Sequence, residues 1–298
     1  MRGVFFKLLE KQMAEQPNTF FLCADMGLGL IESMQEKYPE RTYNVGIAEA
    51  NMASIAAGLC NTGFRPYCYT ISNFLIERAF EQIRNDICLH DYPVVLVGTS
   101  TGFDNGILGP THHVIDEIGC IKGLPGIEII SPVAVSAIPL IMEYLNTSDR
   151  PCYVRIGKGD FDPTVPLTKM NQFVLAPPNA STLVITHGTQ FENCYKALAG
   201  QGNVALYAMN HIHPLSTTDL LPLFQKYSTV VVVEDQLKSS GLYNSLCQWL
   251  VEQQLTGVRL LPRCVPVEYS HEVGHKDYFE DKYGLSTQKL ADFFQSLQ

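Results

Sequence analysis

The stretch YPVVLVGTS, residues 92–100, is apolar at almost every position before its final polar pair. A short, nearly continuous apolar run is typical of a strand buried on both faces, as in parallel sheets. Further short strands are predicted at residues 19–25, 65–70, 127–132 and 151–157, with helical patterns between them. The segment 73–90 predicts an amphipathic helix with a stripe of Phe74, Ala79, Phe80, Ile83 and Ile87. Strands that alternate with helices indicate an α/β fold.

A second series of the same kind follows in the last third of the chain. Residues 158–181 are rich in Pro, Asp and Asn and weakly periodic, which is typical of a connection. Strands are then predicted at 182–188, 204–210, 229–235 and 258–265, again with helices between them. We therefore expect two doubly wound, three-layer α/β/α domains, the first with a mainly parallel sheet. The expected boundaries are 1–165, a linker at 166–179, and 180–298.

Composition limits the classes of function. The chain has 298 residues, of which 17% are charged, and a net charge of −9, which argues against a general affinity for nucleic acid. Small anionic substrates remain open, since a few local cations suffice to bind them. The nine cysteines are scattered without a CxxC pair, as expected in a reducing compartment. No signal peptide or membrane span is predicted, so we expect a cytoplasmic protein.

Two patterns resemble known motifs but do not meet their requirements. HEVGH, residues 271–275, matches HExxH, yet Gly274 interrupts it and its flanks carry no apolar helical stripe. A polar loop is the better prediction, and no metal ligand is expected in this chain. The glycines of ADMGLGL and GFDNGILGPT fit neither GxGxxG nor the Walker A spacing, so they predict turns.

Polar residues cluster where the predicted strands of the first half end. Asp25 follows the first strand, Ser72 and Asn73 follow the second, and Ser100 follows the third. The loop after that third strand contains GPTHH, residues 109–113. Ligands of open α/β sheets bind at the carboxyl ends of the strands. These residues are therefore candidates for a binding site, although a His in a glycine-rich loop is as often an ordinary surface residue.

Glu49 lies in YNVGIAEANMASIAAGLCNTG, residues 43–63, where a strand-like run gives way to a helix rich in small residues. A carboxylate at a helix start gains about 0.3–1 kcal/mol from the helix dipole, which is one explanation for its position. A surface helix does not need so many Ala, Ser and Gly residues, and their size would permit close packing against a partner. The second explanation is that Glu49 contacts a ligand.

Together these segments resemble the transketolase family. The match runs through ADMG, VGIAEANMASIAAG, FLIERAFEQIRND, the long stretch from residue 92 to 132, and YVRIGKGD, and continues more loosely to VVVVEDQLKSSGLYNSL. It corresponds to the second half of a full transketolase: the pyrimidine-binding domain and the C-terminal domain. The GDG segment that holds Mg²⁺ and the thiamine diphosphate tail in the family does not occur in this sequence.

The resemblance implies the C-terminal subunit of a split, transketolase-like enzyme. A separate N-terminal subunit would carry GDG and the Mg²⁺ ligands, and two chains of each kind would form an α2β2 heterotetramer. The cofactors implied are thiamine diphosphate and Mg²⁺. The implied activity, within carbohydrate metabolism, is transfer of a two-carbon ketol unit from a ketose or ketose phosphate to an aldehyde. No contact with membranes or nucleic acid is expected.

The family also implies roles for residues near the cofactor. Glu49 matches the carboxyl that bonds the aminopyrimidine ring and makes its amino group basic, which requires a water-poor site and proton sharing. Phe74 matches an aromatic residue that packs on that ring, although it also fits the core stripe of its helix. Asp25, Met26 and Ile47 match positions in loops near the cofactor and the subunit boundary.

Four further residues correspond to the substrate end of the family's site. His112 matches the His of a GPTH loop that faces substrate oxygens. Arg155 matches an Arg that reaches a sugar phosphate, while a surface cation at a strand end is an equal alternative. Leu108 stands where sugar-phosphate transketolases commonly have Asp, and Ser100 where they have another His. Both departures make the substrate end less polar and favour a specialised donor or acceptor.

Three alternatives to ketol transfer remain open at this point. A deoxyxylulose-phosphate synthase-like carboligase and the β subunit of a 2-oxo acid dehydrogenase belong to the same superfamily. A scaffold subunit without activity would be a protein of a different class. Retention of Glu49, Phe74 and His112 argues against the scaffold, because a scaffold does not need a buried carboxyl group.

Overall fold

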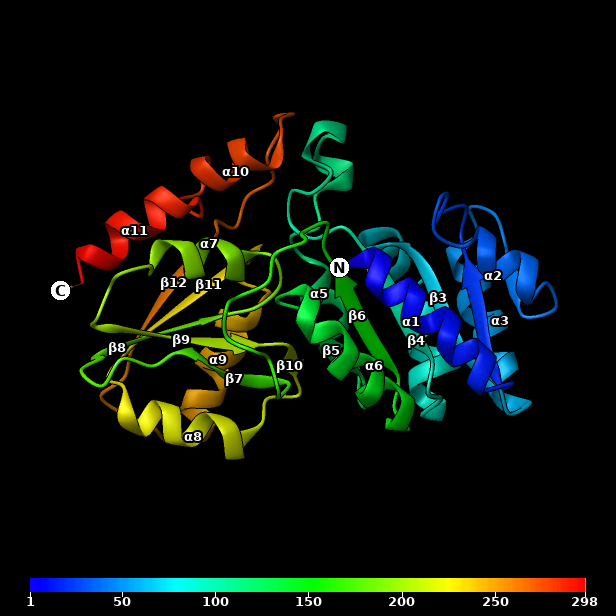
Figure 1. The fold of residues 1–298 in the computed structure, drawn as a ribbon, viewed down its shortest axis with the longest axis horizontal. Helices are drawn as coiled ribbons and strands as arrows, with labels where there is room; N and C mark the ends of the chain where they lie inside the picture. The colour runs from blue at the N-terminus through cyan, green and yellow to red at the C-terminus, as the bar shows by residue number, and fades with distance from the viewer. Residues whose placement is uncertain (298) are drawn as a thin grey trace.

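The computed structural model describes residues 1–297, which form two α/β units lying side by side (Figure 1). The first contains a seven-stranded sheet of order β10-β5-β6-β4-β3-β1-β2, and the second a five-stranded sheet of order β12-β11-β8-β9-β7. All pairs are parallel except β10 with β5 and β7 with β9. The predicted fold class is confirmed: helices cover two mainly parallel sheets.

The regular elements of the first unit alternate along the chain. They are α1 (Arg2–Glu15), β1 (Thr19–Cys23), α2 (Glu32–Lys37), β2 (Thr42–Asn44), α3 (Glu49–Asn61), β3 (Arg65–Ile71), α4 (Phe80–Gln82), β4 (Val95–Thr99), α5 (Glu117–Ile121), β5 (Glu128–Ile130), α6 (Ile138–Thr147) and β6 (Cys152–Ile156). Short 3₁₀ turns lie at Cys88–His90, Gly106–Leu108, Pro110–His112 and Val135–Ala137.

The second unit follows the same plan, with one strand contributed to the first sheet. Its elements are β7 (Asn171–Leu175), β8 (Thr182–Thr186), α7 (Gln190–Ala197), β9 (Val204–Met209), β10 (His211–His213), α8 (Thr217–Lys226), β11 (Thr229–Leu237), α9 (Leu242–Glu252), β12 (Arg259–Val265), α10 (Lys276–Lys282) and α11 (Thr287–Gln295).

Strand periodicity divides the core of the first unit between the two faces of its sheet. Tyr67 and Tyr69 of β3 pack in one cluster with Phe5 of α1, whereas Cys68 between them packs in another with Ala53 of α3. Side chains of a strand alternate between faces, so a fully apolar strand needs helices on both. Three small residues of α3, Ala53 among them, are buried here. They bring α3 close to its own sheet. The sequence had suggested packing against a partner and did not reveal this role of the small residues.

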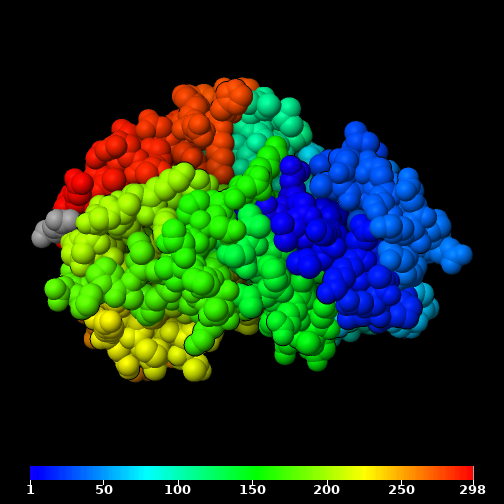
Figure 2. Space-filling model, viewed as in Figure 1, coloured from blue at the N-terminus to red at the C-terminus, as the bar shows by residue number. Residues whose placement is uncertain are grey.

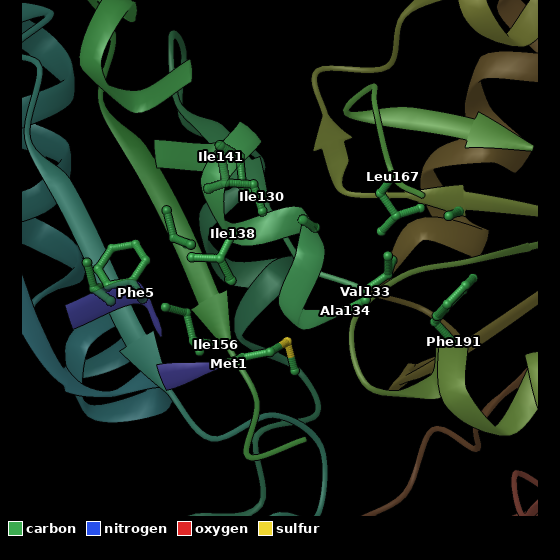
Figure 3. Packing of buried hydrophobic residues seen from close by; sticks show 14 of the residues in the cluster. Met1, Phe5, Ile130, Val133, Ala134, Ile138, Ile141, Ile156, Leu167 and Phe191 are labelled. Atoms are coloured by element: carbon green, nitrogen blue, oxygen red, sulfur yellow. The ribbon is translucent and has the colours of Figure 1, made fainter. Parts of the chain in front are cut away.

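The two units share both a sheet and a core. Strand β10 pairs with the edge of the first sheet, with His211 opposite Ile130. The core is also continuous, because Met1 of the first unit and Phe191 of the second belong to one buried cluster (Figure 3). The segment expected as a linker, 166–179, contains β7, which hydrogen-bonds to β9 as an antiparallel edge strand. The segment between the expected domains therefore includes an edge strand, and flanking prolines are compatible with an edge strand as well as with a connection.

The helix predicted over residues 73–90 is present but irregular. It consists of a π-helical turn at Phe74–Arg78, α4, a second π turn at Ile83–Ile87, and a 3₁₀ turn. Ala79, Ile83 and Ile87 are buried as predicted, whereas Phe74 is only half-buried. A π turn contains more residues than an α turn and so changes the direction of the side chains that follow. Phe74 begins the first π turn and contributes less to the core stripe than predicted.

The HEVGH pattern can be located directly. HEVGH, 271–275, is non-helical and ends just before α10, which confirms the loop prediction; its Glu272 accepts a hydrogen bond from Tyr278. Within residues 1–297, His, Cys, Asp and Glu form no group of three or more that could hold a metal ion. None of the helices in the same range is both long enough and apolar enough to cross a bilayer.

Gly98 is expected to be intolerant of a side chain. A Cβ there would lie 2.5 Å from the Ser72 hydroxyl and 2.8 Å from the Tyr153 ring, both of which are fully buried. We expect Gly98→Ala to lower the free energy of unfolding by about 1–3 kcal/mol in urea denaturation, because the core must shift. Gly58→Ala is the control, since its Cβ meets nothing within 4 Å. It lies in α3, where Ala is about 1 kcal/mol better than Gly. Equal stability of the two variants would contradict the prediction.

Candidate functional site

The carboxyl ends of β1, β3 and β4 lie at one edge of the first sheet, at the top in Figure 1. The residues predicted for the site follow these ends. Two of them have left-handed backbones, Asp25 at φ 50° and Ser100 at φ 70°. This conformation costs a residue with a Cβ about 1–2 kcal/mol, and such strain concentrates at functional sites. The edge therefore carries both the polar residues and the strain expected of a binding site.

Glu49 is the first residue of α3, and only 1% of it is exposed. Its Oε2 accepts a hydrogen bond of 2.7 Å from Nη1 of Arg78, which is itself 44% exposed on its side chain. The unpaired N–H groups of the helix start also favour a negative charge at this position. The carboxylate is thus held in place by a neighbouring cation rather than by apolar residues alone.

Phe74 and His112 extend this arrangement. The guanidinium carbon of Arg78 lies 4.5 Å from the centre of the Phe74 ring, within range of a cation–π contact. The His112 ring also meets Phe74 edge to face, with ring centres 5.2 Å apart. Glu49, Arg78, Phe74 and His112 therefore form one continuous row of contacts, in which a flat aromatic wall stands between a carboxylate and an imidazole.

The loops after β1 and β2 are joined at the end of this row. The Asn44 amide oxygen accepts hydrogen bonds of 2.9 Å from the backbone N–H groups of Asp25 and Gly46. Asp25 is exposed and Met26 is half-buried, while Ile47, two residues before Glu49, is 74% exposed. The structure thus brings Asp25, Met26 and Ile47 to neighbouring loops at the same edge.

Hydrogen bonds with buried polar side chains hold the GPTHH loop and the segment before it in place. The Asn73 amide donates to the Thr111 carbonyl oxygen at 2.8 Å, and the Thr111 hydroxyl lies 3.0 Å from Nδ1 of His112. Ser100 is buried, and its hydroxyl accepts a hydrogen bond from the Asn105 side chain at 2.9 Å. Leu108 is 55% exposed on the loop itself. Of the two departures from the family pattern, Leu108 is accessible to a ligand and Ser100 is enclosed.

Arg155 lies apart from the other predicted residues. It is fully buried where the two units meet, with Nε donating to Glu117 at 2.7 Å and both terminal nitrogens donating to Asp235 at 3.2 Å. These carboxylates raise the pKa of the guanidinium against the effect of burial. Because no part of it faces solvent, the structure does not support the substrate-phosphate role expected from the sequence. Neither of the sequence alternatives foresaw a buried ion pair.

Three residues of the site were not predicted from the sequence. Arg78 stands four positions after Phe74, a spacing that places a cation over a ring on a helix and would have been a usable signal. Glu77 and Asp116 lie within hydrogen-bonding reach of one another, and desolvation together with Asp116 raises the pKa of Glu77 to about 7. Their proximity joins a helix to a loop 39 residues later, so no local pattern could have indicated it.

Comparison with known proteins identifies the family. Residues 1–163, more than half of the chain, match the family described as the transketolase pyrimidine-binding domain. The chain belongs to this family. Among solved structures, one described as a split-gene transketolase, an inactive β4 tetramer, covers 99% of this chain and 96% of its own, with a TM-score of 0.82 and 24% identity. Transketolase from Campylobacter jejuni covers 99% of this chain at 16% identity, with a TM-score of 0.76. These likenesses concern the fold.

The curated relatives that this chain matches are longer than the chain itself. The 1-deoxy-D-xylulose-5-phosphate synthase 1 of Geobacter metallireducens is 27% identical over 95% of this chain, which spans 46% of that protein. The corresponding enzyme of Syntrophus aciditrophicus is 24% identical over 99% of this chain and 46% of its own length. The chain therefore spans about half the length of the curated relatives it matches. It is related to thiamine diphosphate-dependent transferases of the transketolase and synthase type.

Proposed function

We propose that this chain is the pyrimidine-binding subunit of a split, thiamine diphosphate-dependent enzyme that transfers a two-carbon ketol unit to an aldehyde. The observation that carries the proposal is the buried Glu49 carboxylate at the start of α3, in one row of contacts with Phe74 and His112. A buried carboxylate at a ligand-binding edge needs partners, because burial of a charge is costly. Arg78 supplies part of that partner and leaves the rest to a ligand.

The residues present suit one part of the cofactor. When bound, thiamine diphosphate supplies an electron sink at its thiazolium carbon. Glu49 would hold the aminopyrimidine ring by sharing a proton with a ring nitrogen, and Phe74 would cover one face of that ring. The family holds Mg²⁺ and the diphosphate at a GDG segment that this sequence lacks, and within residues 1–297 His, Cys, Asp and Glu form no group of three or more that could hold a metal ion. Both would be held by a second subunit.

His112 would serve the substrate end. It lies against Phe74 and presents an imidazole that is half-buried in a 3₁₀ turn. An imidazole can donate a hydrogen bond to a carbonyl or hydroxyl oxygen as its charge changes. Leu108 and the neighbouring Ile107 are more than half exposed, which favours an acceptor with an apolar part over a fully hydroxylated sugar.

A second candidate reaction has support from the relatives. The two curated relatives described above are 1-deoxy-D-xylulose-5-phosphate synthases, which suggests carboligation after decarboxylation of a 2-oxo acid. The same Glu49, Phe74 and His112 would serve either reaction, so the site does not choose between them. An assay that compares ketose phosphates and 2-oxo acids as donors would distinguish the two reactions.

The partner would be an N-terminal transketolase subunit that carries the diphosphate-binding domain, in an α2β2 arrangement. The solved structure of a split-gene transketolase, described as an inactive β4 tetramer, indicates that a chain of this size and fold can lack activity on its own. Large apolar side chains at the sheet edge also favour a partner: Leu28 is 96% exposed, Ile47 74% and Tyr269 70%. Exposed apolar residues that gather beside a site are typical of an interface.

Reconstitution tests the proposed function. We expect the isolated chain to bind thiamine diphosphate weakly in calorimetry and to turn over nothing, with or without Mg²⁺. Mixed with the N-terminal transketolase subunit of the same organism, it should transfer a ketol unit from a ketose phosphate to aldehydes. Release of CO₂ from a 2-oxo acid donor, without ketol transfer, would instead favour the carboligase. Tight Mg²⁺-dependent binding by the isolated chain, or an inactive assembled complex, would contradict the proposal.

A further inference from the structure

A small cavity lies next to the row of Glu49, Arg78, Phe74 and His112. Its volume is about 130 Å³, and three segments line it: the start of the helix after β3, the GPTHH loop, and the segment before α10. The lining residues include Asn73, Glu77, Thr111, His113, Asp116 and Ser270. The space-filling view shows the segment before α10, in orange, directly against the loop near residue 110, in teal (Figure 2). The cavity therefore lies where the two units of the chain meet.

Two buried side chains of the cavity wall each leave a polar atom without a partner. Asn73 is 6% exposed and donates through its amide nitrogen to the Thr111 carbonyl, which fixes its orientation and leaves Oδ1 as a free acceptor. His113 is 4% exposed and has no partner at Nε2, while the backbone of Gly106 bonds the ring elsewhere. A buried polar atom left unpaired costs about 1–3 kcal/mol, so both atoms indicate a missing donor.

Acidic groups stand in the same wall. The carboxyl groups of Glu77 and Asp116 are neighbours, and neither forms a salt bridge with any residue in the range 1–297. The other charged group that faces them is the carboxylate of Glu117, which Arg155 already neutralises. The raised pKa of Glu77 agrees with this surplus of acceptors and absence of cations. The wall thus offers an amide oxygen and an imidazole nitrogen without donors, together with a pair of carboxyl groups that has no cation among residues 1–297.

We propose that this cavity receives the cationic side chain of an Arg or Lys residue of the partner subunit. The inference rests on the proposed function, since it assigns a contact of the subunit that completes the same site. A guanidinium has five N–H donors and an ammonium three, with no acceptor on either, which matches a wall of acceptors. A protein partner is favoured over a free amine because Tyr269, which lines the cavity, is 70% exposed, and Ile107 and Leu108, just before the GPTHH loop, are also more than half exposed.

The first test measures association with the N-terminal transketolase subunit. We expect Asp116→Asn and Glu77→Gln each to raise the dissociation constant about tenfold or more, mainly through faster dissociation, because a buried cation would lose its counter-charge. The control is Glu143→Gln on α6, an exposed residue on another face that undergoes the same change of charge. The thermal midpoint of each isolated variant shows that folding is intact.

The second test uses the isolated chain and a small probe. Methylguanidinium at millimolar concentration should shift the NMR signals of the Asn73 side-chain amide in a saturable way, and Asp116→Asn should remove the shift. Urea, which is planar but uncharged, is the matched control and should have no such effect. If wild-type subunits do not associate, the proposed function fails. If the partner subunit binds both acidic variants as tightly as wild type, and the probe shifts no signals, the proposal that the cavity receives a cation is overturned.

Discussion

Glu49→Gln is expected to slow proton exchange at the reactive carbon of bound thiamine diphosphate by about 10²–10⁴-fold in the assembled enzyme. The residue is 1% exposed at the start of α3, so a neutral amide of the same shape preserves the packing. The substitution removes the carboxylate, which accepts a hydrogen bond from Arg78 and would share a proton with the pyrimidine ring. The measurement is deuterium exchange of the cofactor proton, followed by NMR after an acid quench.

Two measurements separate this effect from a loss of structure. The complex must still assemble and still load the cofactor, which size-exclusion chromatography and calorimetry report. The exposed Glu143→Gln variant undergoes the same loss of charge and should exchange at the wild-type rate. Should the Glu49 variant exchange within a factor of about three of wild type, Glu49 has no role in the chemistry and the functional proposal loses its main support.

Arg155→Met is expected to destabilise the chain by about 3–5 kcal/mol, because it leaves buried carboxylates without their counter-charge. Glu117 and Asp235 lie on two sides of the guanidinium, and all three side chains are almost completely enclosed. The two carboxylates come from different units, so the loss should also loosen their contact. Urea denaturation at neutral pH measures the change. Arg150→Met, at an exposed position, is the control and should change stability by about 0.5 kcal/mol or less.

The pH dependence of the Arg155 variant provides an independent check. Burial raises the pKa of Glu117 above its ordinary value of 4.5 even beside Arg155, and removal of the cation raises it further. A carboxyl group with a raised pKa binds more protons in the folded state than in the unfolded state. The variant should therefore recover stability relative to wild type as the pH falls from about 8 to about 5.5. A constant difference over this range would show that the carboxylates do not dominate the loss.

The same variant decides how Arg155 should be interpreted. A residue that reached a substrate phosphate would raise KM for phosphorylated substrates and leave stability nearly unchanged. A buried ion pair predicts the reverse. The sequence could not make this distinction, because Arg155 stands at the end of an ordinary apolar strand. Its partner Asp235 lies 80 residues away, at the other side of the boundary between the two units.

Local periodicity was sufficient for the fold class. Runs such as residues 92–100 are apolar at successive positions, and only a sheet covered on both faces accepts such strands. The positions of Asp25 and Ser100 at the sheet edge followed from the same pattern, since polar residues that end parallel strands gather at one edge. Glu49 and His112 were placed at the site by resemblance to the family, not by their spacing.

The details that the sequence missed depend on groups far apart in the chain or on small changes of backbone geometry. The π turn that begins at Phe74 differs from an α turn by a single residue, and hydrophobic spacing tolerates either. The short edge strand β7 lies among prolines that predict a loop equally well. The cavity lined by Asn73, His113, Glu77 and Asp116 exists only where three separate segments of the chain pack together.

The sequence by itself thus determined the alternation of strands and helices and which edge of the first sheet carries the polar residues, because burial and periodicity act over a few neighbouring positions. The tertiary structure alone decided how each charge is paired. It matched Glu49 with Arg78 and enclosed Arg155 between Glu117 and Asp235. It left the pair Glu77 and Asp116 without a cation in residues 1–297. Electrostatic pairing depends on distance in space, and chain order does not encode that distance.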